Sequence, residues 1–99
     1  MLQMEKEYMD GKAVFAVEGR LDAVSGPQFE QELQTLPEDV TELVLDFEKL
    51  EYISSAGLRA VLAAQKRMNR QGSMRVVNVG EAVKAVFDIT GFSTILTIG

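Results

Sequence analysis

The sequence predicts a single α/β domain with a mixed, mostly parallel sheet of about five strands, an antiparallel hairpin at its N-terminal end, and about three to four helices packed on the sheet. Two observations lead to this fold class. Short apolar segments of strand length alternate with segments of helical periodicity, which is typical of strand–helix–strand units with right-handed crossovers. The chain has 99 residues, the size of one domain, so residues 1–99 are treated as one unit.

The N-terminal segment predicts a β-hairpin. The pair Asp10-Gly11 favours a tight two-residue turn and separates Met4–Met9 from Lys12–Glu18. Within the second segment, Ala13–Val17 is a short run rich in strand-forming residues. We therefore expect two antiparallel strands that end near Gly19.

A first helix is predicted after this hairpin. Ser25 suits the N-cap position, Pro27 suits an early helical position, and Gln28 stands at capping-box spacing from Ser25. The helix has one apolar stripe, formed by Phe29, Leu33 and Leu36. Pro37 closes the segment.

The rest of the chain predicts three further strands and two further helices. The strands are Leu43–Phe47, Met74–Val79 and Thr94–Ile98. The helices run from Ser54-Ser55 to about Arg70, with Gln71-Gly72 as a C-terminal cap, and over Glu81–Asp88. In open sheets of this kind, sites gather where strands give way to helix N-termini, which directs attention to residues 19–25 and 47–55.

The composition excludes several kinds of chemistry. The chain has no Cys and no His, so it lacks thiolate nucleophiles, disulfides, Cys or His metal ligands, and the usual general base near neutral pH. Phosphate-cradling glycine motifs are missing, and Asp22, Asp46 and Asp88 lack the spacing of a calcium loop, so neither a cofactor nor a metal is expected. A net charge of -5 argues against direct nucleic-acid binding. With no long apolar run, we expect no membrane insertion and a cytoplasmic protein.

The charges are unevenly distributed. Residues 1–53 contain 13 acidic and 4 basic residues, whereas residues 54–80 contain no acidic residue. The basic residues of this second stretch are Arg59, Lys66, Arg67, Arg70 and Arg75. They form either a solvated outer face of the second helix or a patch that faces a partner.

The pair Ser54-Ser55 at the start of the second helix also has two interpretations. Serines in this position commonly cap a helix by accepting bonds from free backbone N–H groups. Alternatively, one of them accepts a phosphate, which would add about 1.5–2 negative charges at the positive end of the helix dipole. Arg59 stands one turn further on, within reach of such a group.

Three segments resemble the STAS family, whose best-known members are bacterial anti-sigma factor antagonists. Residues 50–58 (LEYISSAGL) are similar to the family signature, an apolar pair followed by Asp-Ser-Ser/Thr-Gly-Leu at a helix start. Residues 17–23 (VEGRLDA) resemble its Gly-x-Leu-Asp segment, and residues 83–92 resemble its closing helix and the apolar turn after it. The resemblance covers nearly the whole chain.

The resemblance implies a phosphorylation switch and not an enzyme. In this family an anti-sigma factor with a GHKL-type ATPase fold acts as a serine kinase on the antagonist, and a serine phosphatase reverses the modification. The unphosphorylated antagonist binds the kinase and releases the sigma factor. By position, Ser55 is the acceptor and Gly57 the family glycine, while Asp22 belongs to the partner-facing loop. The implied partner-binding set is Asp22, Ser54, Ser55, Ala56, Gly57 and Arg59.

The signature departs from the family pattern at two positions. Ser54 replaces the acidic residue before the acceptor, and Ala56 replaces the second Ser or Thr. Ser54 therefore competes with Ser55 as the acceptor. The departure also leaves a second hypothesis, a STAS module of another signalling or transport-regulating system that binds a protein, nucleotide or lipid without a sigma pathway. A third is a small enzyme with Ser55 as nucleophile, which would need a base other than His.

Overall fold

The computed structural model describes residues 2–99, in which four strands and three α-helices follow one another along the chain. The strands are β1 (Leu2–Met9), β2 (Lys12–Leu21), β3 (Glu42–Ile53) and β4 (Ser73–Val77). The helices are α1 (Ser25–Gln34), α2 (Ser55–Gln71) and α3 (Glu81–Thr90), and a 3-10 turn, η1 (Phe92–Thr94), follows α3. No helix within residues 2–99 has the length and apolar composition needed to cross a membrane.

The strands form one sheet in the order β1-β2-β3-β4. β1 pairs with β2 in antiparallel fashion, whereas β2, β3 and β4 are parallel. Asp10 and Gly11 have φ angles of 48° and 81° at the turn between β1 and β2, as a tight primed hairpin turn requires. The predicted fold class, a mixed and mostly parallel sheet with an N-terminal antiparallel hairpin, is confirmed.

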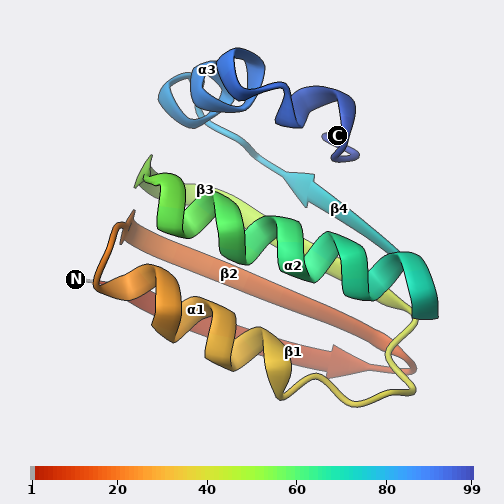
Figure 1. The fold of residues 1–99 in the computed structure, drawn as a ribbon. Helices are drawn as coiled ribbons and strands as arrows, with labels where there is room; N and C mark the ends of the chain where they lie inside the picture. The colour runs from red at the N-terminus through yellow and green to blue at the C-terminus, as the bar shows by residue number, and fades with distance from the viewer. Residues whose placement is uncertain (1) are drawn as a thin grey trace.

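Helices α1 and α2 lie side by side across one face of the sheet, and α3 lies beyond the β4 edge (Figure 1). The core between sheet and helices includes fully buried side chains from every layer, among them Phe15, Phe29, Leu45 and Val61. α3 joins this core through Phe87, whose ring lies 6.5 Å from that of Phe47 on β3. Alternate residues of β2 thus face the helices, namely Ala13, Phe15 and Val17, while Val14 and Ala16 between them are half-buried on the other face of the sheet.

The predicted last strand, Thr94–Ile98, is wrong in most of its length. Gly91 ends α3 in the left-handed conformation, and η1 takes up residues 92–94. The Thr94 hydroxyl and backbone N–H both bond to the Gly91 carbonyl, at 2.8 and 3.2 Å, which fixes this tight turn. Only the last three residues reach the sheet edge, where Ile98 forms a single parallel bridge to Val76. The Val76 N–H donates to the Thr97 carbonyl at 2.9 Å, and the Gly99 N–H donates to the Val76 carbonyl at 3.0 Å.

Candidate functional site

The candidate site lies at the end of the sheet where β2 and β3 give way to α1 and α2 (Figure 1). Leu21 and Ile53 are paired at the ends of the two strands. The Ser54 backbone N–H then donates to the Leu21 carbonyl at 2.7 Å. This bond joins the two strand–helix loops, so the sequence segments around Asp22 and Ser55 lie at the same edge.

The two serines have different environments. Ser54 occupies the N-cap position of α2 in an extended conformation, and its hydroxyl oxygen is buried with no hydrogen-bond partner in residues 2–99. Ser55 is the first residue of α2 and is exposed. No side chain caps α2, so the expectation that these serines cap the helix is wrong. The N-terminal N–H groups of α2 are therefore open to an anion at the Ser55 side chain.

Close backbone packing holds Ser55 in place. A Cβ atom on Gly57 would lie 2.8 Å from both Leu21 Cβ and Ile53 Cγ1, so only glycine lets α2 approach the strand ends this closely. Ala56 packs closely against α1. A Cβ atom on Gly26 of α1 would lie 2.9 Å from the Cβ atom of Ala56. Gly57 is buried and Ala56 is half-buried. Both residues thus position the exposed serine beside them.

Asp22 organises the neighbouring loop. Its Oδ1 atom accepts the backbone N–H groups of Val24 and Ser25, each at 3.0 Å. In return, the Ser25 hydroxyl accepts the Asp22 N–H at 2.9 Å and donates to the Arg20 carbonyl at 2.6 Å. These reciprocal hydrogen bonds between Asp22 and Ser25 form a capping box, in which Asp22 is the capping residue. The predicted cap at Ser25 is therefore wrong, and the helix is capped three residues earlier.

The cap changes the ionisation of Asp22. The backbone N–H of Ser25, then that of Val24, and then the Ser25 hydroxyl hold the pKa of the Asp22 carboxyl below its ordinary value of 3.8. Because the folded pKa is below the unfolded one, the carboxylate stabilises the fold above pH 3.8, and this contribution is lost as the pH falls through the folded pKa.

We expect Asp22→Ala to lower the melting temperature by about 4–8 °C at pH 7, as loss of a helix cap does in a domain of this size. Asp22→Asn keeps a cap acceptor and should cost less. In thermal unfolding followed by circular dichroism from pH 7 to pH 3, the difference between wild type and Asp22→Asn should shrink in the acid range. A difference that is constant over this range would show that the carboxylate charge has no part in the cap.

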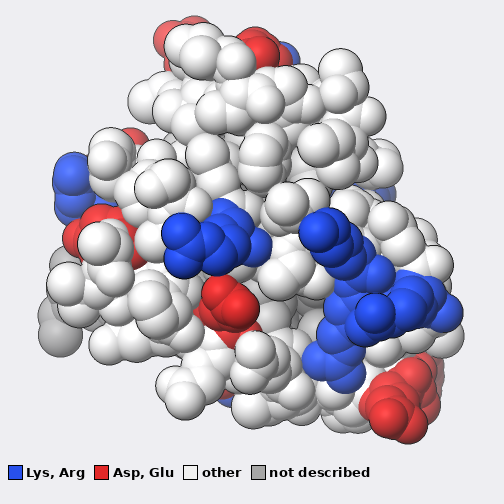
Figure 2. Space-filling model, viewed as in Figure 1, with Lys and Arg blue, Asp and Glu red and all other residues white. Residues whose placement is uncertain are grey.

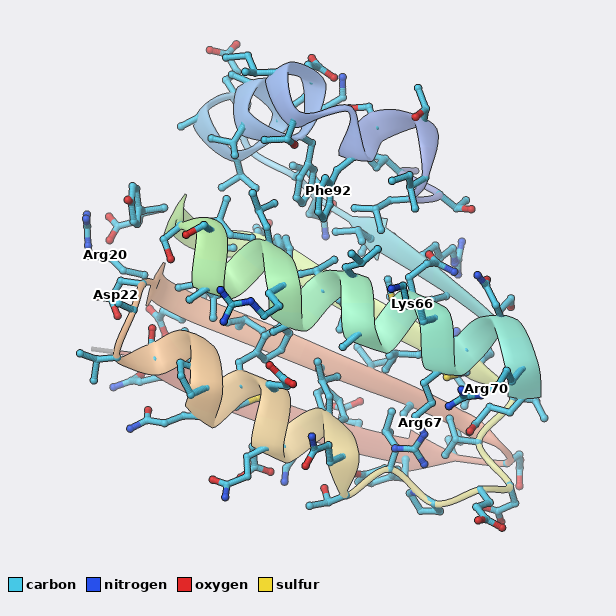
Figure 3. The ribbon with its side chains drawn as sticks, viewed as in Figure 1. Arg20, Asp22, Lys66, Arg67, Arg70 and Phe92 are labelled. Carbon is cyan, nitrogen blue, oxygen red and sulfur yellow. The ribbon has the colours of Figure 1, made fainter. Side chains whose placement is uncertain are left out.

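Two exposed side chains beside the site were missed by the sequence reasoning. Val24 is 75% exposed, and Tyr52 is 40% exposed with the Arg20 guanidinium 4.3 Å from its ring centroid. Figure 3 shows Arg20 and Asp22 at the end of the molecule where α1 and α2 begin. Apolar and aromatic groups of this kind anchor protein interfaces. Neither residue falls in a helix or strand predicted from the sequence, and their exposure depends on neighbours distant along the chain.

Arg59 completes the surface. It is exposed on the next turn of α2, four residues after Ser55, and has no ion pair or side-chain hydrogen bond within residues 2–99. The described residues also hold no cluster of three acidic side chains suited to a metal ion. The exposed groups at this edge are thus a hydroxyl, two cations, a carboxylate and apolar anchors, which is a set suited to protein recognition.

Comparison with known proteins identifies the family. The family model of the STAS domain matches residues 3–99. The chain belongs to the STAS family. This STAS domain is 31% identical over 99 residues to BtrV of Bordetella bronchiseptica, a putative anti-sigma factor antagonist, covering 98% of this chain and 85% of the relative. It is 30% identical over 83 residues to the anti-sigma-B factor antagonist of Bacillus subtilis, covering 83% and 76% of the two chains.

A solved structure matches the STAS domain over nearly its whole length. The crystal structure of an anti-sigma factor antagonist from Mycobacterium paratuberculosis superposes with a TM-score of 0.86 and 25% identity, covering 99% of this chain and 85% of that one. The resemblance read from the three sequence segments is therefore confirmed at the level of the family and the fold.

Proposed function

We propose that this STAS domain is an anti-sigma factor antagonist that is switched by phosphorylation of Ser55. In its unphosphorylated form it binds an anti-sigma factor serine kinase and so releases a sigma factor for transcription. The observation that carries the proposal is the exposed Ser55 at the first position of α2, at the edge where Asp22 and Arg59 also lie. The names of the relatives from Bordetella bronchiseptica and Bacillus subtilis support it.

The environments of the two serines favour Ser55 as the acceptor. A kinase must bring the γ-phosphorus of ATP to within bonding distance of the hydroxyl oxygen, and the buried Ser54 oxygen is shielded from such an approach. The Ser55 oxygen would attack the γ-phosphorus, the bond to ADP would break, and the hydroxyl proton would pass to a base of the kinase. The resulting phosphate would lie at the positive end of α2, with Arg59 one turn away.

In this proposal the domain itself is a binder and not a catalyst. The kinase supplies ATP and the catalytic base, and a serine phosphatase removes the phosphate to restore the binding form. All three would meet in the cytoplasm. The absence of His from the whole chain agrees with a protein on which other enzymes act, since the usual neutral-pH base is missing.

Phosphorylation in vitro tests the assignment. We expect the anti-sigma factor kinase of the same organism, with ATP, to add one phosphate to the peptide containing Ser54 and Ser55, as read by fragment mass spectrometry. Ser55→Ala should abolish the modification, whereas Ser54→Ala should retain it. Full modification of Ser55→Ala would move the acceptor to Ser54, and no modification of the wild type would overturn the switch.

The altered signature favours one second candidate. Ser54 stands where the family has an acidic residue, so a negative charge beside the acceptor is missing. A STAS module that binds its partner constitutively, in a signalling or transport-regulating system, would not need that charge. Such a module would bind its partner equally well before and after treatment with kinase and ATP, which separates the two functions.

A further inference from the structure

The basic residues of the acid-free stretch 54–80 are of two kinds. Arg67 is used inside the fold: its Nη1 donates to the Leu33 carbonyl at 2.9 Å, and its Nη2 donates to the Leu36 carbonyl. Leu33 lies in the last turn of α1 and Leu36 in the segment just after it, so Arg67 fastens α2 to the C-terminal end of α1. Arg75 on β4 is also paired, with Glu42 at 3.6 Å.

Lys66 and Arg70 are different. Both are exposed, and neither has an ion pair or side-chain hydrogen bond to another part of residues 2–99. Figure 3 shows both over the C-terminal half of α2, where Figure 2 shows a basic area. Like charges four residues apart destabilise a helix, and no acidic side chain of the described residues forms an ion pair with either of them. The helix dipole accounts for Arg70 in the last turn but not for Lys66, which lies before it.

Lys66 and Arg70 face the same way as Ser55. At about 100° per residue, the three positions fall within an arc of about 60° around α2. Along the helix axis, Lys66 lies about 16 Å and Arg70 about 22 Å from Ser55. An interface of ordinary size covers about 800 Å² on each partner, which is roughly 30 Å across. An interface that has Ser55 towards one end and extends along the exposed face of α2 therefore also includes this pair.

We propose that Lys66 and Arg70 form a docking patch for an acidic face of the same protein that engages Ser55. This inference rests on the proposed function and names the chemistry of the partner's surface. The patch raises the rate of association by electrostatic steering, because exposed charges at the rim of an interface act mainly on the encounter of two proteins.

The patch is independent of the phosphate. The Debye length is about 8 Å at physiological ionic strength, so a phosphate on Ser55 acts strongly on Arg59 and little on Lys66 or Arg70. Steering by the patch and repulsion by the phosphate are therefore separate terms, and their effects on binding add. An acidic protein face is favoured over other polyanions because the patch continues the Ser55 surface, while the chain as a whole carries -5.

Stopped-flow association with the anti-sigma factor kinase of the same organism tests the patch. We compare wild type with K66E/R70E and the milder K66Q/R70Q, at 50–500 mM NaCl. At the lowest salt we expect the association rate of K66E/R70E to fall by about tenfold, with a smaller fall for K66Q/R70Q. The difference should nearly vanish at the highest salt, and dissociation rates should change by less than about threefold.

The matched control is K49E/K84E, which reverses two lysines on β3 and α3 and gives the same net charge as K66E/R70E. It should associate within about twofold of the wild type. Equal rates and equal salt dependence for both double variants would overturn the patch while leaving the proposed function intact. A wild type that neither binds the kinase nor is phosphorylated on Ser55 would overturn both. Duplex DNA or anionic vesicles bound by wild type but not by K66E/R70E, with unchanged kinase association, would also overturn the proposal.

Discussion

Gly72→Ala is expected to destabilise the domain by about 3 kcal/mol, near the upper end of the usual cost of overpacking. A Cβ at this position would lie 1.8 Å from the Thr41 carbonyl oxygen and 2.5 Å from its carbonyl carbon. Both atoms belong to the backbone, so no side-chain rotation relieves the contact. The chain would have to separate the end of α2 from the start of β3.

That separation would cost more than one contact. The Ser73 N–H donates to the same Thr41 carbonyl at 2.9 Å, and Thr41 itself is held by the Gly11 carbonyl at 2.8 Å. The β1–β2 turn, the start of β3 and the start of β4 therefore meet at one point. Thermal unfolding should show a melting temperature lower by roughly 12–24 °C, at 4–8 °C for each kcal/mol.

Gly80→Ala is the matched control. A Cβ on Gly80, before α3, meets no atom within 4 Å, and this residue has an ordinary φ of -72°. Its melting temperature should fall by no more than about 4–8 °C, well short of the loss expected for Gly72→Ala, since alanine in place of glycine at an N-cap costs about 1 kcal/mol. Equal destabilisation by the two substitutions would mean that loss of glycine itself, and not the Thr41 contact, is responsible.

The sequence predicted this fold well wherever local patterns decide. The Asp10-Gly11 hairpin and the α2 helix follow from turn chemistry and from periodicity. The end of β3 does not follow from such local patterns. The strand runs on to Ile53 through a charged stretch, because Phe47, Leu50 and Ile53 are buried at a spacing of three residues in place of two, beside register shifts in β2. Such irregular pairing depends on the partner strand and breaks the alternation on which strand prediction rests.

The site was predicted in its location but not in its local chemistry. The signature placed Ser55 at the start of a helix, where the structure has it. The capping roles were assigned by spacing, and both were wrong: Asp22 caps α1, and no side chain caps α2. Each cap depends on how the chain enters the helix, and the bond from Ser54 to Leu21 that sets this entry for α2 joins residues 33 positions apart. The spacing of residues within one segment cannot predict a hydrogen bond between two distant segments.

Ser55→Asp is expected to weaken kinase binding by about 100-fold or more, while the fold stays intact. A carboxylate at this position would imitate part of the phosphate charge within the proposed interface. Leaving a charge there without a partner, or against a like charge, costs several kcal/mol, and about 2.7 kcal/mol corresponds to 100-fold. Calorimetric titration against the anti-sigma factor kinase measures the loss.

The effect on stability should have the opposite sign. A negative charge in the first turn of a helix stabilises it by about 0.3–1 kcal/mol, and α2 has no acidic residue in its first turn. The melting temperature of Ser55→Asp should therefore equal or exceed that of the wild type. Weaker kinase binding together with an unchanged or higher melting temperature would show that the added charge, and not unfolding, causes the loss of binding.

Ser55→Asn is the control for size, because it has nearly the shape of Asp without the charge. It should keep kinase binding within about tenfold of the wild type, since asparagine is larger than serine but leaves no unpaired charge at the interface. Equal loss for Asp and Asn would indicate a steric limit at Ser55 in place of an electrostatic switch. Unchanged binding for Asp would contradict the switch itself. A switch of this kind needs no rearrangement of α2, because no side chain caps the helix end that accepts the charge.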